Sequence, residues 1–288
     1  SWDGHTPGNK FASKSRNFGP LPRPGHNGDD WLRPGAINPR ADMTQLWYTL
    51  KGVECIKAIT HSSSARQGYT WPQAPPEYTV DLIEVYPKWG SAEAPAAPFP
   101  IMDAVGHPPR HGGTAHDALF AGFKLGFIGS SGTFFGMPGS NIWENDWANA
   151  ARYDKSGLTA VYAEELSREA IFEALKKRRC YAATYERMEL SFSINDSPMG
   201  SVLVAPDRLR IHVRASGTRQ IKRAEVFKNG EISYHRIGGR EELEVYFDDN
   251  PPNIPTWYYV RVTQSGEDYA WSSPIWVMPE LEDTLDGR

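Results

Sequence analysis

The last hundred residues contain a series of short β-type segments with turn residues between them and no helical pattern. Seven strands are expected, at 190–194, 209–215, 223–228, 231–236, 243–247, 257–263 and 270–277. Leu209, Ile211 and Val213 alternate with polar residues, as in a strand with one buried face. Asn229-Gly230 separates two of the strands and favours a type I′ hairpin. We therefore predict an all-β sandwich domain over residues 188–288.

Upstream of residue 187 the pattern is different, because apolar strand-like runs alternate with helical segments. Strands are expected at 55–60, 80–86, 125–129, 158–162 and 180–184, and helices at 41–51, 116–123 and 167–179. Such alternation is typical of an α/β unit with a largely parallel sheet. Residues 1–40 are rich in Gly and Pro and also hold several aromatic residues, which favours an extended loop packed on the body. The predicted domains are thus 1–187 and 188–288.

Composition excludes several classes of protein. The chain has 26 Gly and 23 Pro, too many for a long coiled coil. Its net charge of −4 argues against a nucleic-acid binder, and no apolar stretch approaches the length of a membrane span. Cys55 and Cys180 are the two cysteines, which favours two reduced, buried thiols over one long-range disulfide. The chain begins at Ser1, so we expect it to be processed or cut from a longer protein, and we favour a secreted or periplasmic location.

Few residues stand out as chemical candidates. His61 follows the strand at 55–60, and Glu84 lies near the end of the strand at 80–86, so the two could share a cation at the strand ends. The alternative, favoured by the residues alone, is that His61 caps a loop and Glu84 pairs with an arginine. A serine nucleophile in the turn at 129–132 would need a histidine and an acid that the sequence does not place. His107, His111 and His116 fall in a Gly/Pro-rich region and are expected to be solvated.

Several stretches taken together resemble one family. Residues 157–184, GLTAVYAEELSREAIFEALKKRRCYAAT, are similar to a block of large proteins of the polymerase and histidinol phosphatase (PHP) superfamily. Residues 194–200, INDSPMG, resemble the motif that follows that block, and 257–264 with 270–276 resemble the terminal strands. The resemblance covers about residues 40–278.

This resemblance implies a fold and an activity. The fold would be a PHP-like distorted (β/α)7 barrel, present in whole or in part, followed by the β-sandwich. The activity would be hydrolysis of a small-molecule or phosphoester substrate by a divalent-metal cluster of Zn, Mn or Fe, which activates water. His61 and Glu84 fall on metal-ligand positions of the family.

The chain also departs from the family at its metal motifs. Gly132 and Phe134 occupy positions where the family has an Asp and a His that bind metal, and neither side chain can be a ligand. The family's N-terminal HxH motif is absent from the sequence. We expect a catalytic metal site that is degenerate or incomplete in this chain.

Two hypotheses follow for function. One is a PHP-type metal-dependent hydrolase with an impaired or reduced site, which a missing N-terminal segment carrying the HxH motif would restore in part. An oligomer of the chain is the other partner considered. The other is a non-catalytic structural or binding protein, with a role in surface assembly or in carbohydrate binding through the Trp and Tyr residues of the sandwich.

Overall fold

The computed structural model describes residues 50, 52–64, 70–71, 80–87, 89–101, 111–131, 156–204 and 206–280. The segment 1–40 and nearly all of the helix expected at 41–51 lie outside these residues, so those predictions stay predictions. Among the residues that are described, no helix is long and apolar enough to cross a membrane.

The N-terminal layer is a small parallel sheet with one helix against it. Its strands β1 (Ala58–Ile59), β2 (Leu82–Tyr86) and β3 (Gly126–Gly129) lie in the order β1-β2-β3. Helix α3 (Ala115–Phe120) begins at a capping box, in which the Thr114 side chain and the Asp117 carboxylate each bond the other's backbone N–H. Three parallel strands cannot bury both of their faces, so this layer needs a partner.

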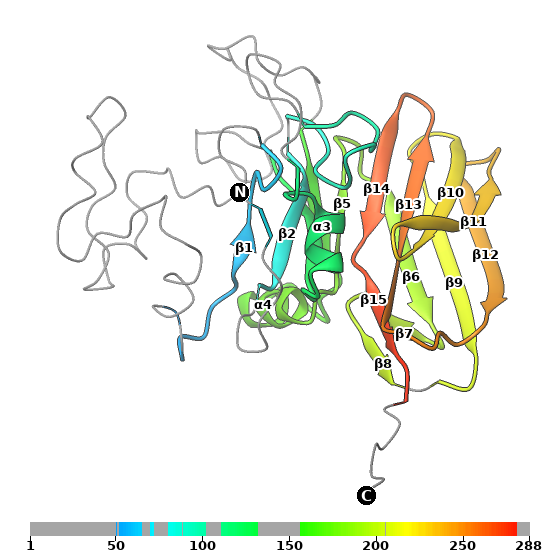
Figure 1. The fold of residues 1–288 in the computed structure, drawn as a ribbon. Helices are drawn as coiled ribbons and strands as arrows, with labels where there is room; N and C mark the ends of the chain where they lie inside the picture. The colour runs from blue at the N-terminus through cyan, green and yellow to red at the C-terminus, as the bar shows by residue number, and fades with distance from the viewer. Residues whose placement is uncertain are drawn as a thin grey trace, which may run out of the picture.

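The partner is the larger of two mainly antiparallel sheets, with eight and four strands (Figure 1). The eight-stranded sheet has the order β11-β10-β13-β14-β5-β4, and β15 and β8 extend it beside β13. Its strands are β4 (Leu158–Val161), β5 (Cys180–Ala183), β8 (Val202–Val204), β10 (Ile221–Lys228), β11 (Glu231–Ile237), β13 (Thr256–Gln264), β14 (Asp268–Ser272) and β15 (Ile275–Met278). The four-stranded sheet has the order β12-β9-β6-β7 and contains β6 (Glu189–Ile194), β7 (Ser197–Pro198), β9 (Leu209–Ser216) and β12 (Glu242–Asp249).

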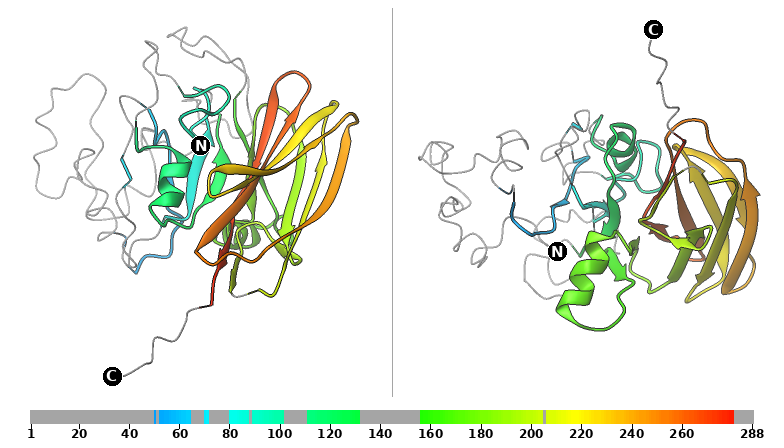
Figure 2. Two further views of the ribbon diagram at one scale, coloured as in Figure 1. Left: turned by 45° about the vertical axis from the view of Figure 1, so that its right-hand side comes forward. Right: turned by 90° about the horizontal axis from the view of Figure 1, so that it is seen from below.

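The eight-stranded sheet lies between the parallel sheet and the four-stranded sheet (Figures 1 and 2), and a hydrophobic core lies on each of its faces. All nine residues of β13 are buried, and its side chains alternate between the cores. Tyr258 and Val260 join the core shared with the four-stranded sheet, whereas Trp257 and Tyr259 join the core shared with β2, β3 and α3. The described part of the chain therefore has three layers, and the eight-stranded sheet is the middle one.

The expected α/β fold class, with a PHP-like (β/α)7 barrel, is wrong for the part of the chain that the structure describes. That part is mostly β, with two helices, α3 and α4 (Arg168–Lys176), and the parallel sheet has three strands. The error comes from runs such as Cys180–Ala183, which are apolar throughout and resemble a buried parallel strand. This strand, β5, is buried on both faces because it lies between the two cores, and it pairs antiparallel with β4 and β14. The middle sheet thus crosses residue 187, where the sequence predicted a domain boundary.

Predictions that depend only on neighbouring residues agree with the structure. Asn229 and Gly230 both have positive φ, 46° and 87°, and Lys228 pairs with Glu231 across them, so the predicted type I′ hairpin is confirmed. Ser167 caps α4 by accepting a hydrogen bond from the Ala170 N–H. The two sheets around the first core agree in outline with the sandwich expected after residue 188.

Candidate functional site

The structure brings together the two residues that the sequence singled out, at the carboxyl ends of the parallel strands. His61 follows β1, Glu84 lies in β2, and Ser130 follows β3 directly. Ile83 and Val85 point into the core, so the Glu84 side chain between them lies on the other face of the sheet. The carboxyl edge of a parallel sheet is where α/β folds place their sites, and this group is therefore the first candidate.

Both carboxylate oxygens of Glu84 are already occupied. Oε2 accepts the His61 backbone N–H at 2.9 Å and lies 3.0 Å from His61 Nδ1. Oε1 accepts a hydrogen bond from the Ser130 hydroxyl. Burial of Glu84, which is 1% exposed, would raise its pKa. The positive charge and hydrogen bonds of His61 and the hydrogen bond from Ser130 outweigh that effect, and the pKa lies below its usual value.

This arrangement does not fit the divalent-metal site that the resemblance implies. Within the described ranges, no group of three or more His, Cys, Asp or Glu side chains is placed to hold a metal ion, so the expected metal-binding character is corrected for those ranges. His61 and Glu84 pair with each other, and the Arg partner considered for Glu84 is replaced by a histidine. Gly132 and Phe134 lie outside the described residues.

A second buried polar cluster joins the N-terminal layer to the middle sheet. Arg261 of β13 donates to Glu93 Oε2 at 2.8 Å, and its Nε and Nη2 both lie 3.0 Å from Glu225 Oε2. Tyr259 donates its hydroxyl proton to Glu93 Oε1 at 2.5 Å. His116 Nε2 lies 2.9 Å from the same hydroxyl. Because that hydroxyl uses its proton in the hydrogen bond to Glu93, it is the acceptor and His116 is the donor in this contact. The cluster is a continuous chain of hydrogen bonds between α3, the loop at Glu93 and two strands.

The expectation that His116 is a solvated loop histidine is therefore wrong. The side chain begins in α3, is 9% exposed, and is surrounded by the rings of Phe120, Phe227, Trp257 and Tyr259. Burial lowers its pKa, which favours the neutral ring that donates to Tyr259. No short-range signal in the sequence could have found this cluster, because its members are up to 168 residues apart.

The two cysteines form no disulfide with each other. Cys180 is fully buried in β5, and burial raises the pKa of its thiol to about 12. Cys55 is only partly buried and lies in the segment before β1. A thiol with so high a pKa is a poor nucleophile at neutral pH, so Cys180 belongs to the packing between the layers.

Comparison with known proteins gives relatives but no established activity. A family model described as protein of unknown function, DUF3604, matches residues 140–197. A protein from Chlamydia pneumoniae is 30% identical over 256 residues, and those from Chlamydia trachomatis serovar D and Chlamydia muridarum are 30% and 31% identical. All three carry the name uncharacterized protein. Each alignment covers 82% of this chain, which spans 40% of the length of each relative.

Two solved structures show a slight likeness. The sulfur carrier protein SoxY from Chlorobium limicola f thiosulfatophilum aligns with 32% of this chain and 79% of its own, at 11% identity and a TM-score of 0.26. The CARDB domain of a Pyrococcus furiosus protein, in complex with di-metal ions, aligns with 33% of this chain and 89% of its own, at 12% identity and a TM-score of 0.24. TM-scores this low carry no argument for fold or function.

Replacing Glu84 should reveal a pH-dependent contribution to stability. The folded-state pKa of Glu84 lies below its usual 4.5, so the carboxylate stabilises the fold fully above about pH 4.5 and loses that effect as the pH falls through the lowered value. Glu84→Gln should therefore lower the free energy of unfolding near pH 6, and the difference from wild type should shrink toward pH 3. Urea titrations across this range measure it.

The control for this experiment is Glu244→Gln. Glu244 also faces a histidine, with Oε1 2.9 Å from His212 Nε2, but its side chain is 52% exposed. An exposed pair of this kind contributes little, so we expect this variant to stay close to wild type. If the two variants behaved alike, the His61–Glu84 pair would not act as a buried ion pair.

Removal of Arg261 should destabilise the protein strongly, because Glu93 and Glu225 would stay buried without their cation. Breaking a buried charge network costs about 3–5 kcal/mol, so Arg261→Met should lower the free energy of unfolding by that amount. Lys228→Met is the control, since the Lys228 ammonium is partly exposed, 2.8 Å from Asp249 and 5.5 Å from the centre of the Tyr258 ring, and its removal should cost about 1 kcal/mol or less. Equal losses in the two variants, measured by urea unfolding, would show that the Arg261 network does not hold the layers together.

Proposed function

We propose that this chain acts as a non-catalytic structural or binding protein derived from the lineage of PHP-type metal-dependent hydrolases. The observation that supports this most directly is the saturation of Glu84, whose two carboxylate oxygens are taken by His61 and Ser130. The pair ties β1, β2 and β3 together at one edge of the parallel sheet. The ancestry is supported by the resemblance over residues 157–184 and 194–200.

The chemistry of the group argues for the structural role. A general base must reach its substrate and must bind a proton near the working pH. Glu84 is 1% exposed, and its pKa is lowered, so it is both out of reach and a weak base. The Ser130 hydroxyl donates to Glu84, and in a serine hydrolase the nucleophile would instead donate to a histidine.

A hydrolytic role remains the second candidate because of where the group lies. His61, Glu84 and Ser130 occupy the carboxyl ends of neighbouring parallel strands, a position typical of catalytic sites. In this candidate, the chain would cleave a phosphoester substrate with groups that complete the degenerate site. One assay separates the two candidates.

The assay measures cleavage of bis(4-nitrophenyl) phosphate by the purified chain at neutral pH, with and without Mn²⁺ or Zn²⁺. We expect neither wild type nor Glu84→Gln to cleave the substrate faster than a protein-free control under any condition, since the proposed role is non-catalytic. Circular dichroism and urea unfolding of both proteins establish that folded protein is compared. Metal-dependent cleavage by wild type that falls by about tenfold or more in Glu84→Gln would overturn the proposal and favour the hydrolytic candidate.

A further inference from the structure

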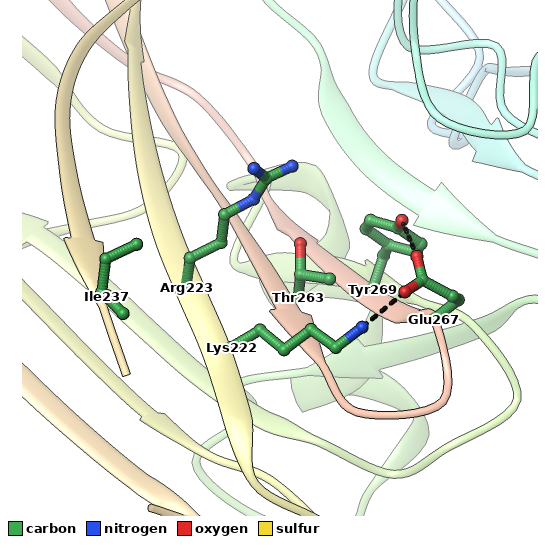
Figure 3. A pocket seen from close by; sticks show the side chains of 6 residues that line it. All are labelled: Lys222, Arg223, Ile237, Thr263, Glu267 and Tyr269. Carbon is green, nitrogen blue, oxygen red and sulfur yellow. Dashed lines mark hydrogen bonds and ion pairs between the residues drawn. The ribbon is translucent and has the colours of Figure 1, made fainter. Parts of the chain in front are cut away.

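A groove of about 320 Å³ (Figure 3) lies on the middle sheet, on the face that packs elsewhere against the N-terminal layer and is turned away from the four-stranded sheet. Its floor is a row of side chains that come from four neighbouring strands and face each other in register. They are Ile237 of β11, Arg223 of β10, Thr263 of β13 and Tyr269 of β14. Glu267 closes one end of the row, and Lys222 joins it at a bulge, where the register between β10 and β13 shifts.

The hydroxyl group of Thr263 is the first feature of this groove that suits the binding of a ligand. Thr263 is 3% exposed, and its Oγ1 is buried with no hydrogen-bond partner among the residues that the structure describes. A buried hydroxyl without a partner destabilises a fold, and valine would fill the same space without that penalty. Figure 3 shows Thr263 in the middle of the groove, between Arg223 and Tyr269. Its hydroxyl is placed to bond a group that enters there.

The charges around Thr263 indicate what that group is. Both oxygens of Glu267 are occupied, Oε1 by Lys222 Nζ at 2.6 Å and Oε2 by the Tyr269 hydroxyl at 2.8 Å. These hydrogen bonds lower the pKa of Glu267, so the acid of the groove is ionised and already neutralised by Lys222. Arg223 is different, because its Nε lies 3.5 Å from Glu225 Oε1 and its two terminal amino groups have no partner within the described part of the chain.

Glu225 does not cancel the remaining donors of Arg223. Its Oε2 is held by two nitrogens of Arg261, each at 3.0 Å. The groups of the groove with no partner among the described residues are therefore two guanidinium amino groups and one hydroxyl, all of which can donate to an oxygen, and the Lys222 ammonium has N–H donors beyond the one given to Glu267. A carboxylate accepts such a set in a planar, two-pronged geometry.

We propose that this groove binds a small organic carboxylate, whose charged end lies against Arg223 and Thr263 and whose short apolar end lies against Ile237. Ile237 is 67% exposed at the opposite margin of the row, and an aliphatic substituent on the ligand would cover it. The inference rests on the proposed binding role of the chain. It is independent of His61 and Glu84, which lie in another sheet.

The test is a titration of the full chain with sodium isobutyrate, followed by changes in protein NMR signals. A ligand of six heavy atoms is expected to bind with a Kd of about 1 mM. Isobutyramide has the same shape without the charge, and its Kd should be higher than that of isobutyrate by about tenfold or more. Thr263→Val and Arg223→Gln should each weaken isobutyrate binding by about tenfold. Thr263→Val should do so with an unchanged or higher Tm, because it removes a buried hydroxyl without a partner.

Two variants serve as controls. Arg210→Gln removes a cation of the four-stranded sheet and should leave isobutyrate binding unchanged. Glu84→Gln should also leave it unchanged, so failure of this inference is distinguishable from failure of the proposed function. The inference is overturned if isobutyrate gives no saturable change in the millimolar range, if isobutyramide binds equally well, or if folded Thr263→Val binds like wild type. Arg223-dependent binding of inorganic phosphate without isobutyrate binding would likewise overturn the assignment to a carboxylate.

Discussion

The guanidinium group of Arg261 is the interaction on which the attachment of the N-terminal layer to the middle sheet depends. It lies between two buried carboxylates, Glu93 from the N-terminal layer and Glu225 from the neighbouring strand β10. Ions in such surroundings are tolerated only when each has its partner in good geometry. The N-terminal layer therefore has a specific place on the middle sheet, which apolar contacts between Trp257, Tyr259 and the layer above would not specify by themselves.

This network also connects the buried contact between the two layers with the groove lined by Arg223 and Thr263. From Glu93 in the loop of the N-terminal layer, the charges alternate in sign through Arg261 of β13 and Glu225 to Arg223 of β10. Glu93, Arg261 and Glu225 are paired with each other, whereas Arg223 keeps N–H donors that have no partner in the described part of the chain. The His61–Glu84 pair lies in the parallel sheet, away from this network, and its two side chains are likewise paired with each other. Paired charges thus support the fold, whereas the guanidinium amino groups of Arg223 and the hydroxyl of Thr263, which have no partner among the described residues, are the basis of the proposed binding.

Several features of the fold follow from neighbouring residues and could be predicted. Asn229-Gly230 tolerates positive φ at both positions, which is enough to specify the hairpin between β10 and β11. Ser167 offers an oxygen to the first turn of α4. His61 and Glu84 follow or end neighbouring strands, so the sequence allowed them to share a cation, although the residues alone favoured an Arg partner for Glu84. In the structure the two side chains contact each other. Their pairing with each other, instead of through a cation, could not be predicted from spacing.

By itself, the sequence determined where strands and turns occur, because alternation, capping and turn preference act over a few residues. It did not determine how the strands pair, since an apolar run such as Cys180–Ala183 suits a parallel strand and an antiparallel strand between two cores equally well. Only the tertiary structure decided that β5 lies beside β14, that His116 lies under aromatic rings, and that Thr263 has a buried hydroxyl in a groove. The physical reason is that burial and pairing are set by residues far apart in the chain, and no local pattern records them.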